Sequence, residues 1–320
     1  MQEARSEKRS QYSYPLVLCY HAVIDGRPPL DDFCFLPRSN FRAQIRFLSL
    51  IGARVLSVEE AVRRTRDGTL PPRSVVVTFD DGFKNNIDVA LPVLTKAGMP
   101  ATIYVNTAFT DTAKSTWASR LTFALSNTEK SSLSFHGEEF DLSSPAARVE
   151  TKKTLSAFIK ENMAGEPWTA LDEIEASLDV EVDPDFPSDS IFRMLGADQI
   201  REASDAGHVS FAAHTRRHPI VSALDDDALL EEIDGSIKDI ERITGRPTAS
   251  FAFPNGRQED FDDRSLTLLA DRGIDIALTT SAPNRFSTED PVQVGRFVVG
   301  SRLPLAGFAS RVLHAFWKLR

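Results

Sequence analysis

Two adjacent carboxylates, Asp80 and Asp81, follow an apolar run in the stretch VVVTFDDGFKNN. Residues 75–79 are mostly β-branched and aromatic, which is typical of a strand buried on both faces. Side chains alternate between the faces of a strand, so neighbouring acids point apart unless the chain turns. Such a pair can divide two tasks, since one carboxylate can bind a metal ion while the other takes a proton from water. The alternative is that DDG is only a turn signal that closes the strand.

Two histidines lie four residues apart in the stretch HTRRH, at His214 and His218. If the chain makes one helical turn there, both imidazoles face the same side. Two imidazoles and one carboxylate, with positions left open for water, are the ligands of a catalytic divalent metal site. A chance pair of surface histidines is the alternative, because the chain contains six histidines. The acidic pair favours the metal site, which needs an acidic ligand and a base for water.

A third histidine, His21, directly follows the apolar run LVLCY. Histidine titrates nearest to neutral pH, so His21 could serve as a general acid opposite Asp80. The alternative is a strand-end histidine that is hydrogen-bonded to backbone. If His21 lies away from the site, His136 and His208 are the remaining candidates for the acid.

These residues follow apolar runs that alternate with helical patterns, which predicts βα units and a parallel sheet. About seven such units indicate an α/β barrel or a doubly wound sheet. Both folds gather functional groups at the carboxyl ends of the strands. The strands expected from the sequence cover residues 15–20, 75–79, 101–105, 208–213, 249–253 and 275–280. His21, the acidic pair, His214 and the Pro254-Asn255-Gly256 turn each follow one of these runs.

The helices expected between these strands carry recognisable end signals. Asn40 is placed to cap a helix, and Gly98 to end one that spans about 87–97. Asp225 to Asp227 offer a cap for a long helix with an isoleucine-rich face, which Gly245 ends. A further helix is expected near residues 198–206.

Residues 107–190 interrupt the alternation of strands and helices. They are rich in Ser, Thr, Glu and Lys, and their helical segments are short. We therefore expect one catalytic domain over residues 15–320 with a mostly helical insertion at about 107–190. Residues 1–14 are expected to form a flexible N-terminal segment.

The composition is that of an ordinary soluble globular protein, with 42% hydrophobic and 26% charged residues. A net charge of −9 argues against a nucleic-acid partner, which would require a basic surface. Cys19 and Cys34 are expected to be reduced thiols. The polar N-terminus lacks the apolar core of a signal peptide, and no stretch could span a bilayer, which predicts a cytoplasmic protein without stable membrane insertion. Peripheral membrane association and the oligomeric state stay open. The C-terminal VLHAFWKLR is expected to be an amphipathic packing helix.

Taken together, these stretches resemble the polysaccharide deacetylases, the NodB-homology family of carbohydrate esterases known as carbohydrate esterase family 4. TFDDG matches the first motif of that family, HTRRH its second, and FAFPNG is similar to its third. The resemblance covers about residues 15–106 and 190–300. CYHAV resembles the circularly permuted branch, typified by enzymes that de-N-acetylate poly-β-1,6-N-acetylglucosamine.

The resemblance implies a distorted (β/α)7-type barrel and a role for each motif residue. Asp80 would be the catalytic base, while Asp81, His214 and His218 would hold the metal, most readily zinc, with cobalt or nickel accepted. In most members of the family, a histidine in a motif near the end of the domain serves as the general acid. No histidine lies between residues 251 and 300 of this chain, so the resemblance to the permuted branch assigns the acid role to His21.

Two departures from the family pattern concern the surroundings of the base and the oxyanion. The arginine that orients the base in many members has no match in the third motif, and Arg296 in VGRFVV is the candidate to replace it. Pro254, Asn255 and Arg296 are grouped as candidates for binding substrate or oxyanion. Asn255 stands where tyrosine is frequent in the family. In the family the backbone N–H of that residue binds the oxyanion, so the change of side chain need not abolish the role.

The predicted function is that of a metal-dependent hydrolase that removes N-acetyl groups from amino sugars in a glycan or glycan precursor. One alternative is a glycosyl or phosphoryl transferase that holds Mg²⁺ or Mn²⁺ on the acidic pair. Two histidines count against it, because hard cations prefer oxygen ligands. Another alternative is a non-catalytic glycan-binding protein with a relict site.

Overall fold

The computed structural model describes residues 14–162, 167–281, 286–287 and 291–318. The predicted flexible segment 1–14 lies outside this range except for Tyr14.

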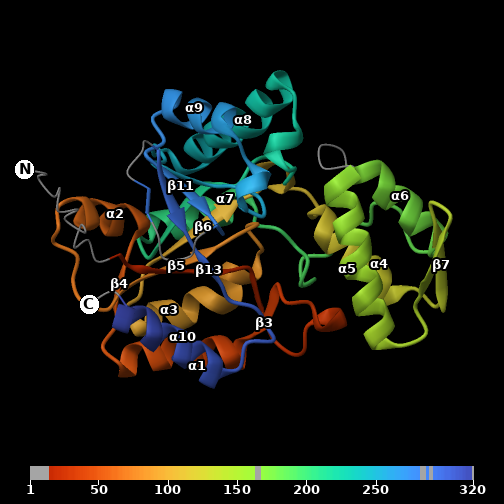
Figure 1. Cartoon of the computed structure of the whole chain (residues 1–320), viewed down its shortest axis with the longest axis horizontal. Coiled ribbons are helices and arrows are strands. Elements are labelled where there is room, and N and C mark those ends of the chain that lie inside the picture. The colour runs from red at the N-terminus through yellow and green to blue at the C-terminus, as the bar shows by residue number, and fades with distance from the viewer. Residues whose placement is uncertain (1–13, 163–166, 282–285, 288–290, 319–320) are drawn as a thin grey trace, which may run out of the picture.

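Eight parallel strands form a nearly closed barrel that is surrounded by helices, which confirms the predicted distorted (β/α)7-type barrel (Figure 1). The strands follow one another around the barrel in the order β12-β11-β10-β9-β6-β5-β1-β13, and the short β4 (Arg54–Leu56) pairs with β5 outside this path. Their bounds are β1 Leu16–Tyr20, β5 Ser74–Phe79, β6 Ala101–Val105, β9 Val209–Ala213, β10 Ser250–Ala252, β11 Ile276–Thr279, β12 Val292–Gly295 and β13 Phe297–Val298.

The two outermost strands, β12 and β13, are consecutive in the chain and are separated only by Arg296. β12 pairs with β11, whereas β13 pairs with β1 on the other side of the barrel. The chain itself therefore connects the two edges of the sheet, between β12 and β13. We call this point the seam of the barrel, and Arg296 lies there.

Helices cover the outside of the barrel. Around it lie α1 Arg38–Leu50, α2 Val58–Arg66, α3 Leu91–Ala97, α7 Ala197–Asp205, α8 Asp226–Thr244, α9 Asp263–Asp271 and α10 Leu305–Lys318. Phe308 of α10 meets Phe47 of α1 edge-on, and its neighbour Val312 is buried, so the C-terminal helix packs on the barrel as expected. Among the residues described, no helix is both long and apolar enough to span a bilayer.

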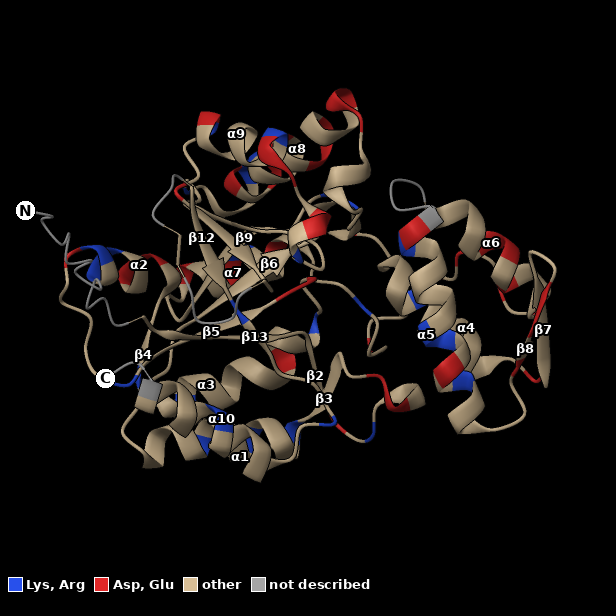
Figure 2. Cartoon of the chain, viewed as in Figure 1, with Lys and Arg blue, Asp and Glu red and all other residues tan. Residues whose placement is uncertain are grey.

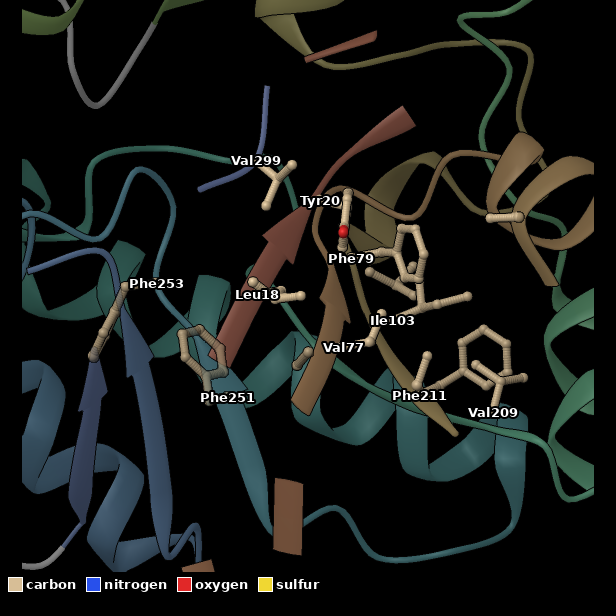
Figure 3. Packing of buried hydrophobic residues seen from close by; sticks show 14 of the residues in the cluster. Leu18, Tyr20, Val77, Phe79, Ile103, Val209, Phe211, Phe251, Phe253 and Val299 are labelled. Carbon is tan, nitrogen blue, oxygen red and sulfur yellow. The ribbon is translucent and has the colours of Figure 1, made fainter. Parts of the chain in front are cut away.

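The core has two layers because side chains alternate along each strand. Residues such as Leu18, Val77, Ile103 and Phe211 point outward into the main cluster beneath the helices (Figure 3). The intervening residues form a second cluster inside the barrel, where the strands contribute Val17, Val76, Tyr104, Ala212, Ala252, Leu278 and Val294. Val58 and Val62 of α2 belong to this inner cluster.

The same alternation decides where the polar strand-end residues point. Each of four polar residues lies an even number of positions after an inner-cluster residue of the same strand or its extension: His21, Asp80, His214 and Arg296. A period of two therefore directs all four toward the inside of the barrel at its carboxyl end.

The insertion between β6 and α7 forms a mostly helical lobe at one side of the barrel (Figure 1). It contains α4 Trp117–Asn127, a hairpin of β7 Ser132–Phe135 and β8 Glu138–Asp141, α5 Pro145–Asn162 and α6 Pro167–Ser177. A separate hydrophobic cluster that includes Trp117, Leu121, Leu155 and Ile174 holds it together. A second small sheet pairs β2 (Ala22–Ile24) with β3 (Phe35–Pro37).

Most of the predicted helix ends are confirmed. Gly98 and Gly245 follow their helices in the left-handed conformation, and Asp225 accepts the N–H of Ala228 as a true N-cap. The prediction for Asn40 is wrong, because α1 already begins at Arg38 after Pro37. Pro37 takes the N-cap position with an extended ψ of 135°, so Asn40 lies inside the first turn, where its side chain cannot act as the cap.

Candidate metal centre and active site

The acidic pair lies where β5 ends and the chain turns sharply. The N–H of Asp80 still donates to the carbonyl of Tyr20 at 2.9 Å, so Asp80 continues the ladder between β5 and β1. Asp81 then adopts a φ of 72°, in the left-handed region that aspartate tolerates better than most residues. The turn gives the two neighbouring carboxylates different directions, as is required if one binds a metal ion and the other accepts a proton.

Gly82 makes this turn possible. Its φ is 81°, and a Cβ atom there would lie 3.0 Å from Cγ1 and 3.2 Å from the Cα of Val105 on β6. Any side chain would therefore collide with the neighbouring strand's backbone, in a conformation that already favours glycine.

The histidine pair lies on the loop after β9, and the conditional expectation of a helical turn there is wrong. Thr215 and His218 both have positive φ values, of 63° and 64°, which breaks any helix. The N–H of His218 donates to the Thr215 hydroxyl at 3.0 Å and closes a compact loop. This loop still brings the rings of His214 and His218 together, with their centroids 5.1 Å apart.

Asp81, His214 and His218 converge as a possible divalent metal site. Oδ1 of Asp81 lies 3.7 Å from Nε2 of His214 and 3.5 Å from Nε2 of His218. One potential ligand atom from each residue lies within 4.8 Å of the others. Two atoms that each lie about 2.1 Å from a tetrahedral ion are separated by roughly 3.4 Å, so the spacing fits.

The state of these groups also fits a cation. Oδ1 of Asp81 is buried and has no hydrogen-bond partner within the described chain. Burial, together with the charge of Asp80, raises the pKa of Asp81 to about 8. A buried carboxylate held beside another acid is unfavourable in its ionised form unless a positive group joins it. A divalent ion would supply that charge.

The imidazoles are prepared to act as neutral ligands. Burial lowers the pKa of His214 to about 4 and that of His218 well below its usual value. Nδ1 of His214 lies 2.7 Å from the carbonyl oxygen of Ala252 on β10. That contact requires the proton on Nδ1, which leaves the Nε2 lone pair for a metal.

Asp80 is held by Arg296 through two hydrogen bonds. Nη1 of Arg296 donates to Oδ1 at 2.6 Å, and Nη2 donates to Oδ2 at 2.8 Å. Burial raises the pKa of Asp80, but the Arg296 guanidinium, together with His214 and His21, more than offsets this and holds the pKa well below its usual range. Asp80 is therefore ionised, and a bidentate pair fixes the plane of its carboxylate. The arrangement fits the base-orienting role considered for Arg296 from the sequence.

Cys19 is a neighbour of Asp80 that the sequence interpretation missed. Its Sγ lies 3.3 Å from Oδ2 of Asp80 and donates to it, since burial raises the thiol pKa well above its usual value. The available signal was its place two residues before His21, because positions i and i+2 of a strand share a face. Cys19 and Cys34 are both free thiols, as expected.

The structure brings His21 to the same centre. Potential ligand atoms of His21, Cys19 and Asp80 all lie within 4.8 Å of one another. Burial lowers the pKa of His21, and Nδ1 of its ring has no hydrogen-bond partner within the described residues. The exposed ring of Phe33 meets His21 edge-on, with the centroids 6.1 Å apart.

The alternative acids lie elsewhere. His136 sits in the turn between β7 and β8, 3.5 Å from Glu173 and half-exposed. His208 is exposed at the start of β9, at the opposite end of the strand from His214. His21 is therefore the remaining histidine that adjoins Asp80.

The Pro254-Asn255 turn follows β10, the strand next to the one that carries His214. Asn255 has a φ of 54°, and its side-chain Nδ2 is buried without a partner in the described chain. Within the same residues, its backbone N–H has no hydrogen-bond acceptor either. The turn thus offers two free donors at the carboxyl end of the barrel.

Comparison with known proteins agrees with this geometry. The polysaccharide deacetylase family model matches residues 67–277. The protein YxkH of Bacillus subtilis, named as a polysaccharide deacetylase, is 34% identical over 90 residues, covering 28% of this chain and 30% of its own. The poly-β-1,6-N-acetyl-D-glucosamine N-deacetylase of Staphylococcus epidermidis is 31% identical over 117 residues, covering 33% and 40%. The matches thus span well under half of these relatives.

Two solved structures share the whole fold. The Streptococcus pyogenes deacetylase PplD, in complex with acetate, superposes with a TM-score of 0.58 at 18% identity over 92% of this chain and 96% of that one. IcaB from Ammonifex degensii gives 0.57 at 19% identity over 94% and 97%. Because the family model matches well over half of the sequence, the chain belongs to the polysaccharide deacetylase family.

Proposed function

We propose that the protein is a metal-dependent de-N-acetylase of N-acetylated amino sugars in a glycan. One observation carries the proposal: the Asp81, His214 and His218 cluster adjoins a second carboxylate, Asp80, which Arg296 keeps ionised. A ligand set beside a separate, oriented base is what amide hydrolysis requires.

The metal would be held by Asp81, His214 and His218. When bound there, a divalent ion supplies Lewis-acid polarisation of the amide carbonyl and lowers the pKa of water. One carboxylate and two imidazoles favour zinc, with cobalt or nickel as substitutes.

Asp80 accepts the proton of the attacking water. Arg296 occupies one lone pair on each oxygen and the Cys19 thiol another, so one of about four acceptor positions is left. The two donors keep the carboxylate from rotating away from the metal ligands. Since the pair is buried, its orientation does not depend on solvent.

His21 donates a proton to the leaving amine. It adjoins Asp80 and is the one histidine at the centre that is not assigned to the metal. The backbone N–H of Asn255 is assigned to the developing oxyanion, because it has no acceptor in the described chain and lies on a turn beside β9. Pro254 precedes Asn255, and its ring restricts one φ angle of that turn.

The proposed substrate class is taken from the substrate for which a similar protein is named. The Staphylococcus epidermidis relative is named for poly-β-1,6-N-acetyl-D-glucosamine. We extend the class to this chain as N-acetylglucosamine-containing oligosaccharides or polysaccharides.

Acetate release from N-acetylglucosamine oligomers, with and without chelator, tests the proposal. Release should stop on removal of metal and return with zinc or cobalt. Magnesium-only activity with release of a nucleotide would favour a transferase instead. Glycan binding without any acetate release by zinc-loaded protein would favour a relict site.

A further inference from the structure

A groove of about 360 Å³ lies where the insertion meets the barrel. The wall next to the barrel includes Ala108 and Phe109, at the start of the insertion just after β6, and Arg217 from the histidine loop. Its insertion wall includes Trp168 and Asp172 of α6. The volume falls within the roughly 300–1,000 Å³ of small-ligand sites.

The barrel wall of the groove is continuous with the metal-binding loop. The N–H of Thr107 donates to the carbonyl of Thr215 at 3.3 Å, and that of Ala108 to the carbonyl of Arg216 at 3.0 Å. The side chain of Asn106 donates to the carbonyl of His214. The segment that leads into Ala108 and Phe109 therefore runs alongside the histidine loop, and Arg217 directly precedes the ligand His218. The groove therefore lies beside the loop that carries His214 and His218.

Trp168 provides an aromatic surface on the insertion side. Its ring meets Phe109 edge-on with centroids 5.9 Å apart, and the Arg120 guanidinium lies 5.8 Å from its centroid. These contacts fix the ring, yet the side chain is only half-buried. A fixed, partly exposed indole can cover the apolar C–H face of a pyranose ring at little entropic cost.

The charged groups of the groove are paired with one another. Arg120, which is buried, contacts Asp172 at 2.7 Å and Asp183 at 3.3 Å, and Lys114 contacts Asp183 at 3.1 Å. Arg217 is balanced by Glu231 at 3.1 Å. Figure 2 shows both signs of charge interspersed on the helices of the insertion.

Such pairing favours a neutral, polyhydroxylated ligand over an anion. The side chains of Asp172, Asp183 and Arg217 are each about half-exposed, at 50%, 46% and 46%. Their free lone pairs and N–H groups can accept from and donate to sugar hydroxyls, each of which does both. An anion would instead meet the carboxylates.

We propose that this groove binds pyranose units that neighbour the one being deacetylated, so that the insertion makes the protein selective for longer glycan chains. The identity of the ligand rests on the proposed function. The existence of a sugar site beside the metal centre rests on the groove itself.

The test compares binding of a dimer and a pentamer of N-acetylglucosamine, β-1,6-linked and β-1,4-linked, by titration calorimetry. Zinc-loaded full-length Asp80→Asn chain serves as the host, because it should bind without turnover. A pentamer of at least one linkage should bind at least about tenfold more tightly than its dimer. Adding Trp168→Ala should remove that preference, whereas Trp317→Ala, at an exposed tryptophan of α10, should preserve it. If Trp168→Ala does not fold, Trp168→Leu keeps an apolar contact with Phe109 and replaces it.

The outcomes separate the groove from the reaction. Equal dimer and pentamer affinities, or a preference that survives loss of Trp168, would overturn the groove proposal even if the wild-type protein releases acetate. Pentamer binding that depends on Trp168 without acetate release by wild-type protein would support the groove and overturn the proposed reaction.

Discussion

The guanidinium of Arg296 binds both oxygens of Asp80, although the two residues lie 216 positions apart in the chain. Arg296 is wholly buried at the seam between β12 and β13, and Asp80 ends β5. The residue that closes the barrel thus also orients the proposed base, which ties barrel closure to catalysis.

Arg296→Gln should shift the acidic limb of the kcat/KM–pH profile to higher pH. The guanidinium lowers the pKa of Asp80 against the effect of burial, so its loss lets that pKa rise. The base must be ionised, so as the pH is lowered the variant should lose activity at a higher pH than the wild type does. Arg296→Lys keeps the charge and should shift the limb less. An unchanged acidic limb in Arg296→Gln would show that Asp80 is not the base.

Removing Arg296 should also reduce stability. A buried carboxylate left without its partner typically costs about 3–5 kcal/mol. Chemical denaturation of metal-free Arg296→Gln above pH 6 should show this loss. The double variant Arg296→Gln with Asp80→Asn should recover part of it, because the unpaired Asp80 carboxylate is no longer present.

Asp80→Asn and His214→Ala should fail in different ways. Asp80→Asn should retain metal but reduce turnover by about 10²- to 10⁴-fold, the usual contribution of a general base. His214→Ala should lose both metal and turnover, because Nε2 of His214 is a ligand atom of the cluster. Metal content by elemental analysis beside acetate release measures both. An Asp80→Asn protein without metal would reverse the assignment of the two acids.

His21→Ala should leave metal content unchanged and reduce turnover by about 10²-fold or more. His21 must be protonated to donate to the amine, so its titration sets the alkaline limb of the profile. Because burial lowers the pKa of His21, that limb should begin at lower pH than for a solvent-exposed histidine, and it should change in the variant. His208→Ala, at an exposed histidine far from the centre, is the matched control. Wild-type activity in His21→Ala would exclude it as the acid.

Zinc affinity should increase with pH up to about 8 and then level off. In the metal-free protein, burial and Asp80 raise the pKa of Asp81 to about 8, so a proton competes with the metal below that pH. Binding at pH 7 should therefore release close to one proton, whereas binding at pH 9 should release almost none from Asp81. Calorimetry in buffers of different ionisation enthalpy measures the number. Equal proton release at both values would contradict the raised pKa.

Gly82→Ala should destabilise the fold more than Gly98→Ala. Both glycines have positive φ, of 81° and 64°, so alanine pays about 1–2 kcal/mol of backbone strain at either position. A Cβ at Gly98 meets nothing within 4 Å, whereas one at Gly82 approaches the backbone of Val105. The extra collision should bring the loss at Gly82 to about 3 kcal/mol or more. Urea denaturation compares the two, and equal losses would mean that β6 yields to the new atom.

The sequence alone determined six of the eight barrel strands, the α/β class and the main motif residues, whereas β12 and β13 were not predicted. These features are local: an apolar run forms a strand, and the period of two along it decides which face each strand-end side chain shares. Asp80, His214 and His21 could therefore be placed on one end of a parallel sheet before any register was known. The turn at DDG was readable for the same reason, because aspartate and glycine tolerate positive φ.

Only the tertiary structure decided which of these residues meet. The contact between Arg296 and Asp80 depends on the strand order, in which the last strands of the chain lie beside the first. No local pattern in the sequence encodes that order. The Cys19 contact with Asp80 depends on the register between β1 and β5, which sets which residues lie opposite one another. The groove at Trp168 depends on how the insertion packs against the histidine loop, and the helical pattern of the insertion alone does not predict that contact.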